Sequence, residues 1–337
     1  MRPALPPPRQ ALLALAALSL VAGWLAPDFS WPRPRPHLVV VIDITQSMNV
    51  VDQPLQAQPG AEPLSRLAAA RQALRQGLDR LPCGSRLGWA IFTEYRSYLL
   101  LQPVEVCAHR GELRDTLAGV DGRMAWSGGS EVAKGLHSAI DLSRKLPGRP
   151  AIVFVTDGHE APPLNPRHRP RFDDTPGEVP GLIVGVGGNL PAAIPKLDPR
   201  GRPLGPWAAD EVLQTDPRSR GRGAGVAAEL MVEGDGPPAA VGLGATPGSE
   251  HLSSLREPYL RLLAGENGLA YHRLRQADEL AAAMLSPALA QPVAVPLAGR
   301  GLLGALALAL LLLRVLPWPA LQRRLAGWPD LPIRLRP

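Results

Sequence analysis

The sequence predicts an α/β fold with a doubly wound, mostly parallel sheet and one antiparallel edge strand. Continuous apolar runs occur at 37–42 (HLVVVI), 151–155 (AIVFV) and 182–186 (LIVGV). Runs of this kind are typical of strands that are buried on both faces. Segments with helical spacing lie between them, as a parallel sheet requires. These two observations predict one α/β domain of the Rossmann-like class.

The remaining elements fit the same plan. Residues 63–81 carry apolar side chains at helical spacing, with Arg and Gln on the other face. Residues 87–93 and 97–102 are expected to pair as an antiparallel hairpin around the Glu94-Tyr95-Arg96 turn. Residues 259–284 predict a helix, a Gly-containing turn, a short strand and a closing helix. The domain is therefore expected to span residues 37–290.

Three oxygen-bearing side chains follow the first predicted strand. Asp43, Thr45 and Ser47 form a D-x-T-x-S pattern at its carboxyl end, where open α/β sheets place their ligands. One carboxylate and two hydroxyls suit a hard divalent cation such as Mg²⁺ or Ca²⁺, with Mn²⁺ as a further alternative. The pattern alone is ambiguous, because the same residue types also cap helix starts.

Two later segments favour the metal-site interpretation. The loop 126–131 (WSGGSE) opens a helical pattern and contributes the hydroxyl of Ser130. A second buried strand ends at Asp157, which Gly158 follows. Parallel strands on either side of a topological switch point would bring these segments together with the first. The predicted metal ligands are Asp43, Thr45, Ser47, Ser130 and Asp157.

In this order, D-x-T-x-S, GGS and TDG resemble the metal-ion-dependent adhesion site of von Willebrand factor A domains. Thr45 stands where Ser is usual and Ser130 where Thr is usual, and both replacements keep the hydroxyl. The resemblance covers roughly residues 37–284. It implies a cation whose open coordination position is filled by an acidic residue of a partner protein.

Further segments resemble a narrower, membrane-tethered bacterial group that works with MoxR-type AAA+ ATPases. The loop 193–212 resembles its I-P-x-x-D-x-x-G-x-P segment. DITQSMNV, LPCGSRLG, GGSEVAKGL, VTDGHEAPP, GLIVGVGG and HLSSLREPYL are similar to the MxaL accessory proteins of methanol dehydrogenase clusters. This resemblance implies a role in maturing a periplasmic quinoprotein dehydrogenase, including its Ca²⁺ loading, with the ATPase and other A-domain membrane proteins as partners.

The charge distribution argues against nucleic-acid binding. The sequence has a formal net charge of +6, but residues 1–36 and 294–337 hold 10 of the 36 Lys and Arg and only 2 of the 30 Asp and Glu. The intervening domain is therefore slightly acidic, and it shows no basic stripe with aromatic residues. The whole chain contains 39 Pro and 34 Gly. These residues gather in 161–180 and 188–248, which are expected to form long loops.

Apolar runs occupy both ends of the chain. After a short cytoplasmic N-terminus (1–10), residues 11–27 predict a signal anchor or a signal peptide. Residues 295–316 predict a transmembrane helix, and 317–337 a basic cytoplasmic tail. The positions of the arginines place both ends in the cytoplasm. The expected location is the bacterial inner membrane, with the domain in the periplasm.

The two cysteines lie symmetrically about the predicted hairpin turn. Cys83 and Cys107 are each twelve residues from Tyr95. Positions equidistant from a turn face each other in an antiparallel pair, which favours a disulfide in an oxidising compartment. The alternative is two separate buried thiols.

The sequence favours a binding protein over an enzyme. It contains no nucleophile elbow, phosphate loop or dinucleotide fingerprint. Two other functions stay open: a metal-dependent hydrolase with His159 or Glu160 as base, and an aerotolerance-type envelope-stress scaffold. A separate candidate is a second Ca²⁺ site at Asp173, Asp174 and Glu178. That site lacks the spacing of a calcium loop, so a solvated loop is expected there.

Overall fold

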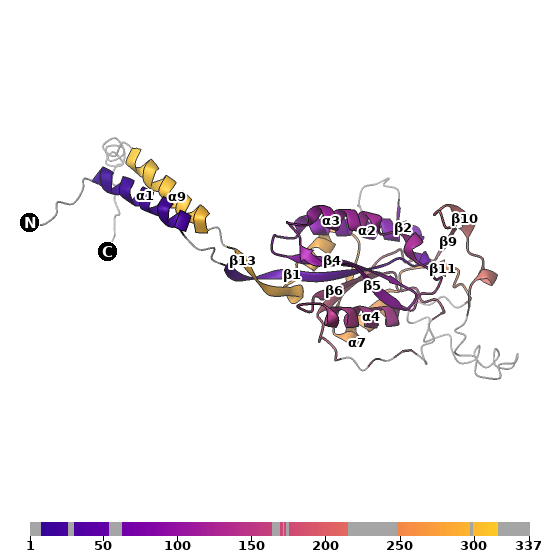
Figure 1. Ribbon diagram of the computed structural model, residues 1–337. Coiled ribbons are helices and arrows are strands. Elements are labelled where there is room, and N and C mark those ends of the chain that lie inside the picture. Colours follow the sequence, from indigo (N-terminus) through magenta and orange to yellow (C-terminus); the bar gives the residue numbers. More distant parts are fainter. Residues whose placement is uncertain are drawn as a thin grey trace, which may run out of the picture. The chain divides into compact units, whose positions relative to one another are not determined.

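We describe the chain from a computed structural model, shown in Figure 1. It describes residues 8–25, 30–53, 63–163, 169–170, 172, 175–214, 248–296 and 299–315. The chain divides into two compact units. One comprises residues 33–293, and the other combines residues 1–32 with 294–337. Each unit is considered by itself below.

The larger unit is built on a mostly parallel sheet with the order β12-β7-β6-β1-β4-β5. Every neighbouring pair on this path is parallel except β4 and β5, which form an antiparallel edge. The strands are β1 (Ser30–Asp43), β4 (Arg86–Thr93), β5 (Arg96–Glu105), β6 (Ala151–Thr156), β7 (Gly181–Gly185) and β12 (Ala270–Arg273). A further strand, β13 (Ala290–Pro296), pairs with β1. The predicted fold class of this domain is confirmed.

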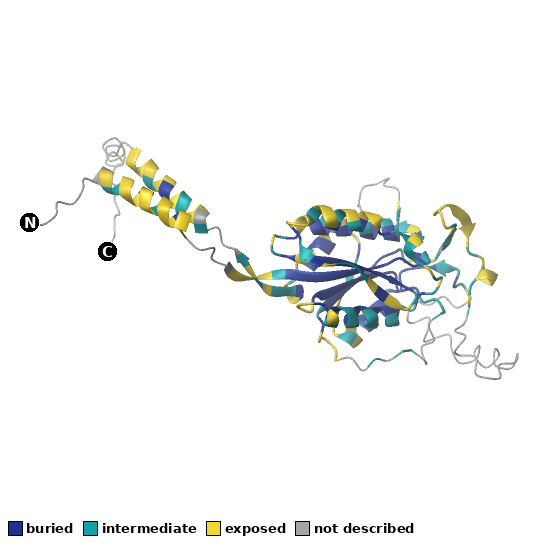
Figure 2. Cartoon of the chain, in the orientation of Figure 1, coloured by how far each residue is buried: buried dark blue, intermediate teal, exposed yellow. Residues whose placement is uncertain are grey.

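Helices cover both faces of the sheet, and β1 shows why (Figures 1 and 2). Leu38, Val40 and Ile42 pack into one buried cluster with the helices α2 (Arg66–Arg80), α3 (Arg110–Gly119) and α8 (Ala277–Met284). Val39 and Val41 alternate with them and pack into a second cluster with α4 (Val132–Lys145) and α7 (Glu257–Asn267). Alternate residues of a strand point to opposite faces, so an uninterrupted apolar run needs a helical layer on each side.

The helices agree closely with the sequence pattern. They are α2 (Arg66–Arg80), α3 (Arg110–Gly119), α4 (Val132–Lys145), α7 (Glu257–Asn267) and α8 (Ala277–Met284). The Ser65 hydroxyl caps α2 by accepting a hydrogen bond from the Ala68 N–H at 3.2 Å. Gly268, with φ of 66°, ends α7 in the left-handed conformation that glycine favours. The predicted helix-turn-strand-helix ending is therefore confirmed.

Close packing of α4 against β4 positions the loop that carries Ser130. A Cβ at Gly135 would lie 2.1 Å from the Phe92 ring, so only glycine allows this approach. The Ser97 hydroxyl also donates to the Gly135 carbonyl at 2.9 Å. The start of α4 is thereby fixed against the end of the β4–β5 hairpin.

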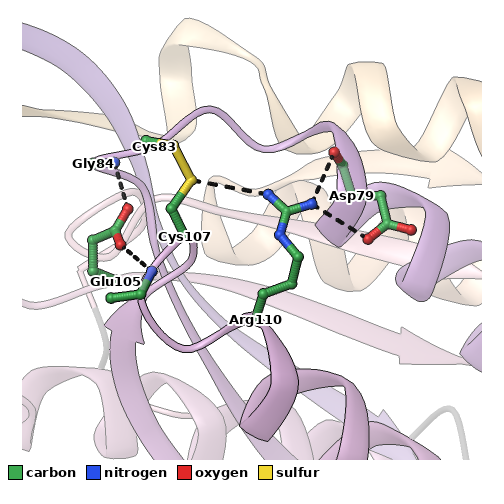
Figure 3. The surroundings of a disulfide bond; sticks show 7 residues. Asp79, Cys83, Gly84, Glu105, Cys107 and Arg110 are labelled. Carbon is green, nitrogen blue, oxygen red and sulfur yellow. Dashed lines mark hydrogen bonds and ion pairs between the residues drawn. A yellow bond between two sulfur atoms is a disulfide. The ribbon is translucent and has the colours of Figure 1, made fainter.

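A disulfide closes the other end of this hairpin (Figure 3). Cys83 and Cys107 are bonded, with their Cα atoms 5.3 Å apart. The pairing of β4 with β5 begins at Thr93 and Arg96, and irregularities on either side of Trp89 shift the register. The predicted bridge is confirmed, although the strand pairing is less regular than simple symmetry about Tyr95 implies.

Glu105 supports the bridged end without forming a metal site. Its carboxylate accepts hydrogen bonds from the Gly84 and Ala108 backbone N–H groups, both at 2.7 Å (Figure 3). Potential ligand atoms of Cys83, Glu105 and Cys107 lie within 4.8 Å of one another. Because the two sulfur atoms are bonded to each other, no thiolate is present to hold a metal.

The regions expected to be long loops contain short strands. The described part of 188–248 includes β8 (Ala192–Ala193), β9 (Pro195–Leu197) and β10 (Pro203–Pro206). β9 pairs with β10, and β8 pairs with β11 (Leu252–Ser253). Another small pair, β2 (Val51–Gln53) with β3 (Leu64–Ser65), precedes α2. Asp173, Asp174 and residues 215–247 lie outside the described residues.

The smaller unit contains two helices that lie side by side, α1 (Pro8–Leu25) and α9 (Gly299–Val315) (Figure 1). They coincide with the apolar runs that predicted an anchor at 11–27 and a span at 295–316. Among the described residues, however, none of the helices combines the length and the apolar character needed to cross a bilayer. The predicted tail 317–337 is outside the described residues.

Candidate metal centre

The D-x-T-x-S residues fold into one compact turn at the end of β1. Asp43 ends the strand, and the 3-10 turn Gln46–Asn49 follows it. Asp43 Oδ1 accepts hydrogen bonds from the Thr45 backbone N–H at 2.9 Å and from the Thr45 hydroxyl at 2.7 Å. The hydroxyl oxygens of Thr45 and Ser47 are 3.4 Å apart. Asp43 is completely buried and both hydroxyl residues nearly so.

The end of β6 contributes to the same cluster. The Thr156 hydroxyl donates to Asp43 Oδ2 at 2.6 Å and accepts from the Gly158 N–H at 3.0 Å. The Ser47 hydroxyl hydrogen-bonds to the Asp157 carboxylate. Because β1 and β6 are adjacent and parallel, their carboxyl ends meet at the same edge of the sheet. Four of the predicted ligands are thus brought together: Asp43, Thr45, Ser47 and Asp157.

Asp157 is held by a guanidinium that the sequence pattern did not reveal. Arg66 Nη1 donates to Asp157 Oδ2 at 2.5 Å, and both side chains are completely buried. The Ser253 hydroxyl donates to the same oxygen at 3.2 Å. Asp157 Oδ1 accepts from the His159 N–H at 3.0 Å. The sequence pattern puts the Arg residues of 63–81 on the helix face opposite the apolar side chains, and Arg66 departs from that expectation because it is completely buried.

The two buried carboxyl groups are in different electrostatic environments. Burial, with the nearby charge of Asp157, raises the pKa of Asp43 to about 7. Burial alone would also raise the pKa of Asp157, but Arg66, together with His159 and the hydrogen bonds to this carboxylate, outweighs burial and lowers that pKa. Asp157 therefore carries the negative charge, whereas Asp43 gains from any additional cation placed beside it.

Ser130 lies in the loop before α4, and its hydroxyl has no hydrogen-bond partner among the described residues. It forms a bridge with Glu94 at the β4–β5 turn, and its backbone N–H and C=O pair with Ala161, each at 2.7 Å. Its side chain is 2% exposed. Within the described part of the chain, Ser130 Oγ finds no hydrogen-bond partner. A buried hydroxyl is normally paired, so Ser130 Oγ is available to bind a ligand or a water.

The residues present fit a divalent cation. Two carboxylates and three hydroxyls provide only oxygen ligands, which Mg²⁺ and Ca²⁺ prefer. The unpaired oxygen of Ser130 and the raised pKa of Asp43 are both features that a cation would satisfy. Asp43, Thr45, Ser47 and Ser130 would hold it, and Asp157 would join them through an oxygen already shared with protein donors.

Exposed aromatic side chains gather beside the Ser130 loop. In the described part of residues 33–293, they are Tyr95, Tyr98 and Trp126, which we call the aromatic rim. Tyr98 and Trp126 make an edge-to-face contact with centroids 4.9 Å apart. The Trp126 indole N–H donates to Glu94 Oε2 at 3.3 Å, which links the rim to the residue bridged with Ser130.

The geometry offers little to the hydrolase alternative. Glu160 Oε1 accepts from the Ala133 N–H at 3.2 Å and from the Tyr259 hydroxyl at 2.6 Å, so it is engaged at the start of α4. Burial raises the pKa of Glu160 to about 7. Burial also lowers the pKa of His159 to about 4, so this imidazole is neutral at pH 7. Whether the chain catalyses a reaction stays untested.

Sequence reasoning missed four residues that shape the site: Asp52, Arg66, Thr156 and Ser253. Thr156 could have been predicted from the sequence, because it immediately precedes Asp157 in a TDG sequence. Arg66 gave a weaker signal, an Arg between Ser65 and Leu67 at a helix start. Nothing in the sequence connects Ser253 with Asp157, since they are 96 residues apart.

Comparisons with known proteins address the family. Residues 38–159 match the von Willebrand factor type A domain. A UPF0353 protein from Mycolicibacterium paratuberculosis is 33% identical over 158 residues, covering 46% of this chain and 44% of the relative. The chain thus matches less than half the length of this curated relative.

Solved structures also show similarity, at low identity. An aerotolerance-related membrane protein from Bacteroides fragilis aligns over 74% of this chain and 96% of its own, with a TM-score of 0.43 and 15% identity. BatB from Bacteroides thetaiotaomicron aligns over 75% of this chain and 96% of its own, with a TM-score of 0.44 and 15% identity. The family match at 38–159 begins in β1 and ends just past Asp157, so this part of the chain is similar to the von Willebrand factor type A domain.

Proposed function

We propose that this chain is a membrane-attached, metal-dependent protein-binding domain that assists the maturation of a periplasmic quinoprotein dehydrogenase such as methanol dehydrogenase. Its oxygen cluster would hold Mg²⁺ or Ca²⁺, and an acidic residue of the client would complete the coordination. When bound, the cation supplies positive charge for the client's carboxylate. The chain's own residues position that charge and surround it with a binding surface.

Two observations support the binding role: Asp43, Thr45, Ser47 and Asp157 form a cluster of buried oxygens, and the predicted ligand Ser130 has a buried hydroxyl that is unpaired among the described residues. The aromatic rim adds a further reason. Aromatic side chains are enriched in protein interfaces, and here they border the loop that supplies Ser130.

The membrane attachment is supported by the surface of the helix pair. α1 exposes Leu15, Leu18 and Trp24, and α9 exposes Leu302, Leu306 and Leu308. Between Arg9 and the end of α1, and from Gly301 to Leu313, the sequence contains no charged residue. Exposed apolar surface of this extent is typical of contact with lipid or with another protein. We place the pair at the bacterial inner membrane, with the domain in the periplasm.

The choice of client rests on the similarity of DITQSMNV, GGSEVAKGL and VTDGHEAPP to accessory proteins from methanol dehydrogenase clusters. By the same kinship, a MoxR-type ATPase and other A-domain proteins are proposed partners. A second candidate is an aerotolerance-type scaffold without a dehydrogenase client. It draws on the description of the Bacteroides fragilis protein, which is an aerotolerance-related membrane protein.

Co-purification of the full-length chain with apo-methanol dehydrogenase tests the proposal. In the presence of Mg²⁺ the dehydrogenase should be retained, and a chelator or Asp43→Ala should release it. The Ca²⁺ content of the dehydrogenase should fall in cells that lack this chain. Retention of other A-domain proteins in place of the dehydrogenase would favour the scaffold. Retention that resists both chelator and Asp43→Ala would contradict a metal-dependent role.

A further inference from the structure

Arg66 is the most extensively bonded side chain in the described part of the site. Its Nε and Nη2 donate to the Asp52 carboxylate at 2.9 and 2.6 Å. Its Nη1 donates to Asp157 Oδ2 at 2.5 Å and to the Ser253 hydroxyl at 2.6 Å. Its Nη2 also reaches the Ser253 carbonyl at 3.0 Å. The guanidinium thus connects Asp52 in β2, Asp157 just after β6 and Ser253 in β11. The Arg66 side chain is completely buried.

The surrounding backbone is shaped for this side chain. Gly187 has φ of 126°, and a Cβ there would lie 2.7 Å from Arg66 Nε. The Gly188 N–H donates to Asp52 Oδ2 at 3.0 Å, so Asp52 is itself fixed. Burying an arginine is costly unless it is paired and fully hydrogen-bonded, and here both conditions are met. The position is therefore built to hold a positive charge beside the candidate ligands.

We propose that Arg66 is an internal counterion that lowers the affinity of this site for its divalent cation and thereby makes cation binding depend on the partner's carboxylate. This inference rests on the proposed metal-dependent function. Without a cation, Arg66 neutralises Asp157 and offsets the cost of burying that carboxylate. With a cation present, two positive charges share Asp157, and they repel each other.

An acidic residue of the partner offsets the repulsion between Arg66 and the cation. Arg66 cancels one of the two ligand carboxylates, so the protein alone provides less negative charge than its residues suggest. A carboxylate from the client restores this negative charge. Cation binding is thereby coupled to client binding. Asp52 moderates the effect, because it shares the guanidinium with Asp157 through a two-point contact.

Two substitutions test the inference with opposite expected signs. Arg66→Gln removes the positive charge, so Mg²⁺ and Mn²⁺ should bind about tenfold tighter. Asp52→Asn leaves Arg66 with Asp157 as its remaining carboxylate, so the same ions should bind several-fold weaker. Arg66→Lys keeps the charge and should stay within about twofold of the parent. Arg75→Gln makes the same charge change at an exposed position of α2 and is the matched control.

Affinity is measured on the full-length protein by titration calorimetry with Mg²⁺ and by electron paramagnetic resonance with Mn²⁺. Thermal unfolding of the metal-free protein reports folding in parallel. If Arg66→Gln does not fold, the weaker binding expected of Asp52→Asn still decides the matter. Equal or weaker binding by folded Arg66→Gln would show that Arg66 only positions Asp157, and the counterion role would be wrong. If the parent itself binds neither ion, the metal-dependent function fails together with the inference.

Discussion

The two ends of the β4–β5 hairpin differ in how they are stabilised. At the end near Arg86 and Glu105, the Cys83–Cys107 disulfide closes the hairpin, and the Glu105 carboxylate accepts hydrogen bonds from backbone N–H groups (Figure 3). At the Glu94 end, the hydroxyls of Thr93 and Ser130 are buried and, among the described residues, unpaired. The first end is fixed by a covalent bond, although the buried hydroxyl of Ser85 there is also unpaired among the described residues. The second end carries Ser130, a predicted ligand, and is the end where we propose that a cation and a partner bind.

Removing the disulfide should have the largest effect on stability. The bridge joins residues separated by 24 positions, so the double substitution Cys83→Ser, Cys107→Ser should lower the free energy of unfolding by about 3 kcal/mol. Urea denaturation of the oxidised parent and the variant measures this loss. Cation affinity should be unchanged, because the bridge and the oxygen cluster lie at opposite ends of β4. A parallel loss of cation affinity would break the comparison.

Replacing Glu160 should change how stability depends on pH. Its pKa is raised from 4.5 to about 7, so the folded state favours the protonated acid. Its stabilising contribution is complete below pH 4.5 and is lost as the pH rises through 7. Glu160→Gln should therefore be more stable than the parent by about 2 kcal/mol at pH 8, and about equal to it at pH 4. A constant difference across this range would show that Glu160 keeps an ordinary pKa.

Truncating the aromatic rim should weaken client binding and leave the cation site intact. Trp126→Ala removes a side chain that is 57% exposed and should weaken binding of the apo-dehydrogenase about tenfold, or about 1.4 kcal/mol. Leu190→Ala, at an 80% exposed apolar residue, is the matched control. Surface plasmon resonance in Mg²⁺ gives both affinities. Equal losses in the two variants would mean that the rim has no special role.

The fold was predictable because its signals are local and repeated. The apolar runs that became β1, β6 and β7 contain enough information to specify a buried parallel sheet. The ligand positions of Asp43 and Asp157 followed from strand ends in such a sheet. The disulfide followed from two cysteines that flank one hairpin.

Arg66 was not predictable in the same way. Its environment is assembled from Asp52, Asp157 and Ser253, and the sequence does not show that these positions meet. Asp157→Ala would leave a buried guanidinium with one carboxylate fewer, so it should destabilise the metal-free protein. Asp43 has no such partner, which makes it the cleaner position for testing the metal site.

Titration calorimetry of the full-length protein with Mg²⁺ and Ca²⁺ tests the central claim most directly. The parent should bind one ion, and Asp43→Ala should bind it about 100-fold more weakly. Ser130→Ala removes a neutral ligand and should lose less. Metal-free stability of Asp43→Ala should equal or exceed that of the parent, because a buried carboxyl group beside Asp157 is removed. If Asp43→Ala binds the ion as tightly as the parent does, the oxygen cluster is not the metal site.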